Sequence, residues 1–247
     1  MFSLLLLLEV GYGLVDMQYD ALVQFYDSTD GANWMPNNWL QSDVYCDWIG
    51  VSCDDNDNVV SLNVQHMGLN GQLSDLTNLT YLSSLYLSGN NLKDSDLCLL
   101  GGLSYLRVLD MTDTSLDGNI PECICALSKL HSLHLDNNSL IGDVPPCLGD
   151  SQQLGLKLFT ARCNRLQYSF SHLDLAVVDY VDLQCNPTIN CGGEDYVVNR
   201  TGYYACGLNH CSTCVKKTTC AAFLDVGGCR YYLRNSTASK IQPPYYR

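Results

Sequence analysis

One group of side chains in this sequence could do chemistry together. Asp110, His134 and Asp136 stand at matching places in a repeated pattern, and His131 is close by. We expect Asp110 and His134 to be neighbours on adjacent strands, a geometry that would raise the pKa of the histidine and could hold a metal ion. Metal and catalytic sites usually need a concave pocket. We therefore favour a plainer interpretation, an exposed ion pair on a wet surface.

A second candidate is the pair of thiols in Cys211-Ser-Thr-Cys214, whose spacing is compatible with zinc binding or redox chemistry. Four more cysteines surround it, and structural disulfides are the better interpretation in a secreted chain. We find no nucleophile motif, phosphate loop or pair of catalytic acids. The sequence therefore predicts neither an enzyme nor a cofactor or metal site.

The element that positions these side chains is a repeat over residues 59–190. Its strand-plus-turn unit predicts an α/β solenoid of about six right-handed leucine-rich-repeat coils, with a parallel sheet on the concave side. In each coil an asparagine after the strand can satisfy backbone groups inside the coil. The pattern LxxLxLxxN recurs every 22 to 26 residues as LSSLYLSGN (82–90), LRVLDMTDT (106–114), LHSLHLDNN (130–138) and LKLFTARCN (156–164), with looser copies VVSLNVQHM (59–67) and VDYVDLQCN (178–186).

Residues between the inward leucines should face the concave side and form a binding strip on the order of 25 to 30 Å long. Such a strip suits a peptide, a glycan or another protein. Its central row is Asn63, Tyr86, Asp110, His134, Thr160 and Asp182, and the next row is Gln65, Ser88, Thr112, Asp136, Arg162 and Gln184.

The charge is unevenly distributed. The net charge is -13, while residues 201–247 hold six Lys or Arg against Asp225, a local balance of +5, so residues 1–200 carry -18. So acidic a body excludes nucleic acid as a partner, because phosphate contacts need clustered Lys and Arg.

The N-terminus and the 14 cysteines predict a secreted protein. The apolar run Phe2–Leu8 is too short to span a bilayer, and we interpret residues 1–16 as a signal peptide. The alternative is a short buried strand or hydrophobic cap. No later stretch reaches transmembrane length. The predicted N-glycosylation sites are Asn78, Asn137, Asn199 and Asn235.

Residues 17–58 predict an N-terminal cap, because the open end of a solenoid exposes the first coil's interior. A helix from Met17 to Thr29 carries Ala21, Leu22, Phe25 and Tyr26 on one face. The cap also contains three tryptophans, Trp34, Trp39 and Trp48. A short disulfide between Cys46 and Cys53 should close it.

The other cysteines are interpreted from their place in the repeat, with buried free thiols as the alternative. Cys163 and Cys185 both precede the ladder asparagine in successive coils, so we expect them to be bonded. Two bridges should join three coils through Cys98, Cys123, Cys125 and Cys147, with the choice between Cys123 and Cys125 open. Residues 191–229 predict a stapled C-terminal cap, and residues 230–247 an extended basic tail; the cap's unassigned cysteines are Cys191, Cys206, Cys211, Cys214, Cys220 and Cys229.

The segment ALVQFYDSTDGANW…CDWIGVSC, leading into VVSLNVQHMGLNGQL, resembles the cap and first repeat of plant-type leucine-rich-repeat proteins. That group includes receptor-kinase ectodomains, short co-receptors and polygalacturonase inhibitors. LDGNIP (116–121) and LIGDVP (140–145) resemble its LxGxIP segment. The resemblance covers residues 17 to about 190 and implies binding of peptides, proteins or glycans without catalysis.

The chain departs from the family pattern in a few coils. LKDSDLCLL in repeat two and LQYSFSHL in repeat five replace the LxGxIP segment, so we expect the second sheet to be interrupted at both. Met67 and Thr114 replace the ladder asparagine, which should weaken the internal hydrogen bonds.

Two functions follow from these patterns. The first is extracellular recognition through the concave strip, part of which a glycan on Asn137 would cover. The alternative is a structural subunit of an extracellular filament, in which the acidic body of one copy meets the basic tail of the next.

Overall fold

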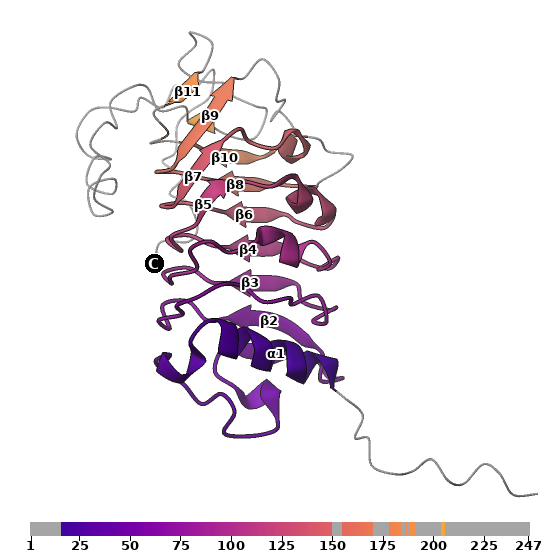
Figure 1. The fold of residues 1–247 in the computed structure, drawn as a ribbon. Coiled ribbons are helices and arrows are strands. Elements are labelled where there is room, and N and C mark those ends of the chain that lie inside the picture. The colour runs from indigo at the N-terminus through magenta and orange to yellow at the C-terminus, as the bar shows by residue number, and fades with distance from the viewer. Residues whose placement is uncertain are drawn as a thin grey trace, which may run out of the picture.

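The protein is a solenoid whose short strands stack one above another (Figure 1). The computed structural model describes residues 16–149, 155–169, 178–183, 186, 188–190 and 204–205. Its main sheet runs in the order β1-β2-β3-β4-β6-β8-β10-β12, antiparallel between β1 and β2 and parallel from β2 onward. The strands are β1 (Val51–Cys53), β2 (Val59–Asn63), β3 (Ser84–Tyr86), β4 (Val108–Asp110), β6 (Ser132–His134), β8 (Leu158–Thr160), β10 (Tyr180–Asp182) and β12 (Tyr204–Ala205).

The strand register follows the leucine pattern. Leu62, Leu85, Leu109 and Leu133 pair in sequence across β2, β3, β4 and β6, and none of the four is exposed to solvent. Phe159 of β8 continues this inward row. Because side chains alternate along a strand, the residue after each of these positions must face the concave side. The predicted alignment of the central row is therefore confirmed, and its role in binding stays a prediction.

The ladder asparagines satisfy the backbone inside the coils. The Asn90 side-chain amide donates to the carbonyls of Leu87 at 2.7 Å and Val64 at 2.9 Å. Its oxygen accepts from the N–H groups of Gly68 at 3.1 Å and Leu69 at 3.0 Å. Asn138, Asn164 and Asn186 each donate in the same way to carbonyls of their own coil and of the preceding one.

Thr114 takes the ladder position in repeat three. Its hydroxyl donates to the Met111 carbonyl at 2.7 Å, which replaces one of the two bonds that an asparagine amide makes. The threonine side chain is too short to donate a second hydrogen bond to a carbonyl of the preceding coil, as the asparagine amides do. Met67 occupies the same position in the first repeat. Its side chain is buried and has no amide group to make these hydrogen bonds.

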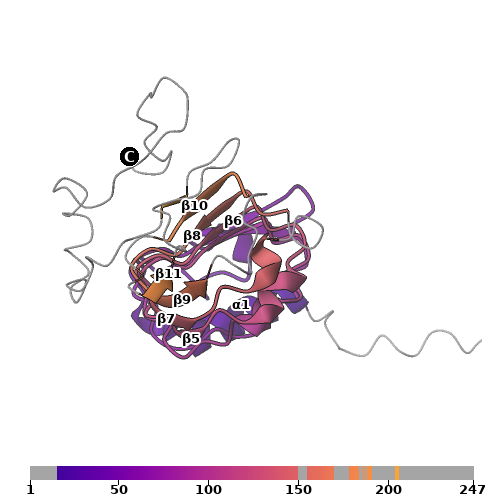
Figure 2. The same ribbon diagram turned by 90° about the horizontal axis from the view of Figure 1, so that it is seen from above.

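A second sheet, in the order β11-β9-β7-β5, lies on another side of the coils (Figure 2). Its strands are β5 (Asp117–Asn119), β7 (Ser139–Gly142), β9 (Arg165–Ser169) and β11 (Thr188–Asn190). Repeat two contributes only an isolated bridge between Asn70 and Asn91, as predicted. The interruption predicted in repeat five is wrong. Leu166 keeps the inward apolar position there, is fully buried and pairs with Gly142 of β7.

Short 3-10 helices close the remaining side of the coils, and two disulfides join them. They are η3 (Leu97–Leu100), η4 (Glu122–Ala126) and η5 (Pro146–Gly149). Cys98 bonds Cys123 with a Cα separation of 5.4 Å, and Cys125 bonds Cys147 with 5.8 Å. Two bridges across three coils are therefore confirmed. The structure decides the pairing that the sequence left open.

The N-terminal cap packs around three tryptophans. Helix α1 (Met17–Ser28) buries Ala21, Leu22 and Phe25, and Asp16 caps it by accepting from the N–H groups of its first turn. The Trp39 ring centroid lies 4.9 Å from those of both Trp34 and Trp48. Two 3-10 turns, η1 (Gly31–Asn33) and η2 (Tyr45–Asp47), and the predicted Cys46–Cys53 disulfide complete the cap.

One cysteine prediction differs from the structure. Cys163 is a free thiol, contrary to the bridge expected with Cys185. The prediction used the spacing of neighbouring strands, but Cys163 lies beyond the end of β8, in a left-handed turn with φ 52°. Cys185 lies outside the described residues.

Several other predictions concern parts of the chain that the structure does not describe. These are the signal peptide up to residue 15, the C-terminal cap with its six cysteines apart from β12, the basic tail and the glycosylation sites Asn199 and Asn235. About four turns of the solenoid are established, so the count of six coils stays a prediction.

Candidate binding surface

The concave row is open at its N-terminal end and closed at its C-terminal end. Asn63 is exposed, whereas Tyr86, Asp110 and His134 are half-buried. Thr160 and Asp182 continue the same row with only 7% and 4% of their surface exposed. The sequence predicts a strip that is exposed to solvent, and this prediction is wrong for Thr160 of β8 and Asp182 of β10. We call the accessible part the open half; it consists of Asn63, Gln65, Tyr86, Asp110, Thr112 and His134.

Hydrogen bonds hold the polar groups of the open half in place. Gln65 donates from Nε2 to Ser88 Oγ at 2.7 Å and to Asp110 Oδ2 at 3.1 Å. The other carboxylate oxygen of Asp110 accepts from the Thr112 N–H at 3.0 Å. The Asp110 carboxylate is thus preorganised but still accessible, which is what a residue needs to orient a ligand.

Asp110 and His134 are paired in register across β4 and β6, as predicted. The predicted rise in the pKa of His134 is wrong. Burial lowers it, and the nearby Asp110 carboxylate, which acts in the opposite direction, does not compensate. The His134 ring contacts Thr160, with Nδ1 3.2 Å from Oγ1.

His131 does not join this group. It is exposed before the start of β6, and its Nδ1 lies 2.6 Å from the Lys129 carbonyl oxygen. Among the residues that the structure describes, no three His, Cys, Asp or Glu side chains gather to hold a metal ion. The residues proposed as an active constellation are therefore not brought together as one site.

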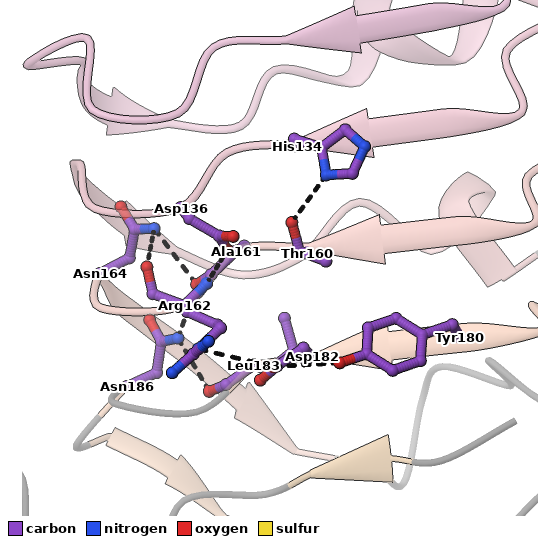
Figure 3. A network of polar contacts seen from close by, with 10 residues as sticks. All are labelled: His134, Asp136, Thr160, Ala161, Arg162, Asn164, Tyr180, Asp182, Leu183 and Asn186. Atoms are coloured by element: carbon purple, nitrogen blue, oxygen red, sulfur yellow. Dashed lines mark hydrogen bonds and ion pairs between the residues drawn. The ribbon is translucent and has the colours of Figure 1, made fainter. Parts of the chain in front are cut away.

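The buried end of the concave face contains a polar network (Figure 3). Three residues predicted for the binding strip take part in it, namely Asp136, Arg162 and Asp182. The Arg162 backbone N–H donates to Asp136 Oδ1 at 2.6 Å. The guanidinium Nε of Arg162 lies 3.4 Å from Asp182 Oδ2. Tyr180 donates its hydroxyl to the same Asp182 oxygen at 3.4 Å. Asp136 and Asp182 are 9% and 4% exposed, so they belong to the framework more than to a contact surface.

Burial raises the pKa of Asp136 from its usual value of 3.8 to about 7. The negative charge of Asp182 acts in the same direction. The Arg162 backbone N–H, the Thr160 hydroxyl and the Arg162 guanidinium oppose the rise without cancelling it. Asp136 therefore changes its charge close to neutral pH.

Two predicted glycosylation sites lie within the described residues. Asn137 occupies a left-handed turn after β6 with φ 55°, is half-buried, and donates its backbone N–H to the Arg162 carbonyl at 2.8 Å. Asn78 is half-buried in the turn that precedes β3. A glycan on Asn137 would stand beside Asp136, at the exit end of β6.

Sequence reasoning missed a group of side chains where the chain enters the concave strands, three of them exposed and Lys129 half-buried. Tyr81, Tyr105, Arg107 and Lys129 had not been singled out. The signal was available, because Tyr81, Tyr105 and Lys129 each precede the first leucine of successive repeats.

Within the described ranges, no helix is long and apolar enough to cross a membrane.

The cap and repeats match known families. Residues 15–54 match the leucine rich repeat N-terminal domain, and residues 81–103, 105–127 and 129–151 match the leucine rich repeat. Among curated relatives, the receptor-like protein kinase BRI1-like 3 of Arabidopsis thaliana is 40% identical over 89 residues, which cover 33% of this chain and 8% of that protein. The probable LRR receptor-like kinase RPK1 of the same plant is 36% identical over 124 residues, 49% of this chain and 22% of the relative.

Solved structures agree with this similarity. The BIR2 ectodomain from Arabidopsis thaliana has a TM-score of 0.59 at 26% identity, over 72% of this chain and 95% of that one. A chain of the BIR3–SERK2 complex from the same plant has a TM-score of 0.59 at 25% identity, over 73% and 97%. The chain thus has the leucine-rich-repeat fold, and its cap and repeats are similar to those of plant receptor ectodomains.

Proposed function

We propose that this protein is an extracellular recognition module that binds a peptide or a protein through the open half of its concave face. The observation that carries the proposal is the change in exposure along one row, from exposed Asn63 through half-buried Tyr86, Asp110 and His134 to buried Asp182. A ligand would find an aromatic side chain, a positioned carboxylate and hydrogen-bonding groups on adjacent strands. Tyrosine is among the residues enriched in binding hot spots.

The comparisons support a binding role. One similar structure is that of a complex between BIR3 and SERK2. Another, the peptide hormone receptor RGFR1 in complex with RGF2, has a TM-score of 0.50 at 28% identity, over 58% of this chain and 22% of that one. The relatives that carry kinase names share only a small part of their length with this chain, and our proposal includes no catalytic activity.

Charge favours a particular type of ligand for this face. The protein carries a net charge of -13, and Asp110 adds an accessible carboxylate to the open half. Basic groups on a ligand would be attracted over long distances and oriented by Asp110. We therefore expect a peptide or protein segment with Lys or Arg next to an apolar residue that contacts Tyr86.

Selection from a displayed peptide library against the secreted full chain tests this proposal. The double variant Tyr86→Ala with Asp110→Ala should weaken binding of the selected peptides by roughly thirtyfold or more, since the loss of even one hot-spot residue costs about 2 kcal/mol. The control is Ile141→Ala with Asp143→Ala, an apolar and an acidic side chain that are exposed on or next to β7 of the second sheet, away from this face. Selected peptides that bind the double variant and the control equally well would exclude the open half as the site.

Secretion and glycosylation are part of the proposal and need their own measurement. The chain should leave a eukaryotic host cell with a glycan on Asn78, and mass spectrometry of tryptic peptides would detect it. A glycan on Asn137 would restrict access from the exit end of β6 and leave Asn63 and Tyr86 accessible on β2 and β3. Retention of the chain inside the cell would contradict an extracellular role.

A further inference from the structure

A second surface lies along the edge of the solenoid where the chain enters each concave strand. Leu82, Leu106 and Leu130 are fully buried there, so the residues on either side of each leucine point outward. We call this surface the entry edge; it consists of Tyr81, Ser83, Tyr105, Arg107, Lys129, His131 and Lys157.

Backbone hydrogen bonds place the inner residues of the entry edge in a continuous row. The N–H of Arg107 donates to the Ser83 carbonyl, that of His131 to the Arg107 carbonyl, and that of Lys157 to the His131 carbonyl, each at 2.8 Å. Three basic side-chain types therefore follow one another at the spacing of neighbouring strands, about 4.8 Å. Because a carbonyl only accepts, the His131 Nδ1 donates to Lys129, which leaves Nε2 to meet a ligand.

The outer row is a stack of two tyrosines and a lysine. The ring centroids of Tyr81 and Tyr105 are 5.9 Å apart, and the residues are 48% and 46% exposed. The Lys129 Nζ lies 3.6 Å from the Tyr105 centroid, in a cation–π contact. Tyr105 thus lies between partners from the coils before and after it. Such a ring offers little open face for a sugar to stack on, and its edge is better suited to side chains of a protein.

The entry edge concentrates positive charge on an acidic molecule. Three of its residues are among the six Lys and Arg of the described part, which are Lys93, Arg107, Lys129, Lys157, Arg162 and Arg165. Arg107 is exposed and makes no ion pair within that part. Lys157 is 3.9 Å from Asp179, an exposed pair that water screens strongly.

These observations narrow the type of partner. A long polyanion would be repelled by the rest of a molecule with a net charge of -13. A short acidic segment would meet only the local positive charge. Tyrosine and arginine are also the residue types most enriched in protein–protein hot spots.

We propose that the entry edge docks an acidic segment of a partner protein. Carboxylates of that segment contact Arg107 and Lys129, and an apolar side chain between them packs against Tyr81 and Tyr105. Because this surface shares no residue with the open half, the proposal is independent of the function proposed for the concave face.

Binding of the full chain to an array of synthetic peptides tests the proposal. The array alternates Glu with Leu or Tyr, and it includes copies with Gln in place of Glu and short oligouronates as anions of another class. We expect capture by the acidic peptides only, with less capture at higher salt. The double variant Arg107→Glu with Lys129→Glu should weaken capture by on the order of tenfold or more.

The matched control is Lys93→Glu, a reversal at an exposed lysine that lies 4.0 Å from Asp117, away from the entry edge. It should leave capture unchanged, and Tyr105→Ala should weaken capture without any change in charge. Equal loss in the control, capture of the Gln copies, or capture of oligouronates in place of peptides would each overturn the proposal. Thermal unfolding of all variants would show that the reversals leave the fold intact.

Discussion

The backbone N–H of Arg162 donates to the buried Asp136 carboxylate at 2.6 Å. This bond favours the ionised form of Asp136, yet burial and the neighbouring Asp182 outweigh it, and the pKa stays at about 7. A framework residue of the repeats therefore takes up a proton near neutral pH.

The stability of the protein should consequently depend on the charge of Asp136. The pKa is about 7 in the folded state and near 3.8 in the unfolded chain, so folding binds a proton between these values. The contribution of protonated Asp136 to the free energy of unfolding is complete below about pH 4 and is lost as the pH rises through 7. Asp136→Asn should flatten this dependence and raise the free energy of unfolding at pH 8 by on the order of a few kcal/mol, which a higher unfolding temperature would report.

Thermal unfolding between pH 4 and pH 8 measures this effect. Asp143→Asn, a substitution of the same type at an exposed position, should follow the wild-type curve. A parallel shift of the Asp136→Asn curve at all pH values would contradict the assignment.

The ladder asparagine Asn90 should be sensitive to replacement by an apolar residue. Asn90→Leu leaves the carbonyls of Val64 and Leu87 and the N–H groups of Gly68 and Leu69 without their partner. Each orphaned buried group costs about 1–3 kcal/mol, so the variant should unfold at a much lower denaturant concentration or fail to fold.

Asn90→Thr provides the comparison, because Thr114 occupies the same position in the next repeat and bonds the Met111 carbonyl. The threonine variant should retain part of the lost stability. If both variants unfold at the same denaturant concentration, the internal hydrogen bonds do not explain the preference for asparagine.

Removal of either disulfide that joins the 3-10 helices should destabilise the coils that it connects. Cys98 and Cys123 are separated by 25 residues, and Cys125 and Cys147 by 22, so the two loops closed are nearly equal. Chain entropy predicts a loss of about 3 kcal/mol for each Cys-to-Ser pair. Denaturant unfolding of the two paired variants should give similar losses, and an unaffected midpoint in either would show that its bridge constrains little.

Truncation of Trp39 should open the N-terminal cap. Its ring lies between Trp34 and Trp48 and is 3% exposed, and its Nε1 donates to the Ile49 carbonyl at 2.9 Å. Trp39→Ala should cost about 3–5 kcal/mol and expose the apolar end of the first coil. Tryptophan fluorescence and light scattering should report earlier unfolding and aggregation.

Trp39→Phe keeps an aromatic ring at this place but removes the hydrogen bond to Ile49. We expect it to retain most of the stability. A phenylalanine variant as unstable as the alanine variant would mean that the hydrogen bond, and not the packing, holds the cap together.

The repeat pattern by itself determined the fold, the strand register and the membership of the concave row. Leucines at a constant spacing must all point into the coil, and a slip of one residue would turn every one of them to the solvent. For this reason the repeat pattern alone aligns four concave residues across their strands, namely Asn63, Tyr86, Asp110 and His134. The cap helix and the Cys46–Cys53 bridge were also predictable, since their signals are local.

Only the tertiary structure decided which part of the row is accessible. Asp136 and Asp182 carry the same carboxylate as Asp110, but their burial depends on what packs around them, which no repeat pattern encodes. Burial also reversed the direction predicted for the pKa of His134, although its neighbour Asp110 had been identified correctly. The placement of whole coils against one another likewise decides that Cys98 bonds Cys123 and not Cys125. It also decides the stack of Tyr81, Tyr105 and Lys129.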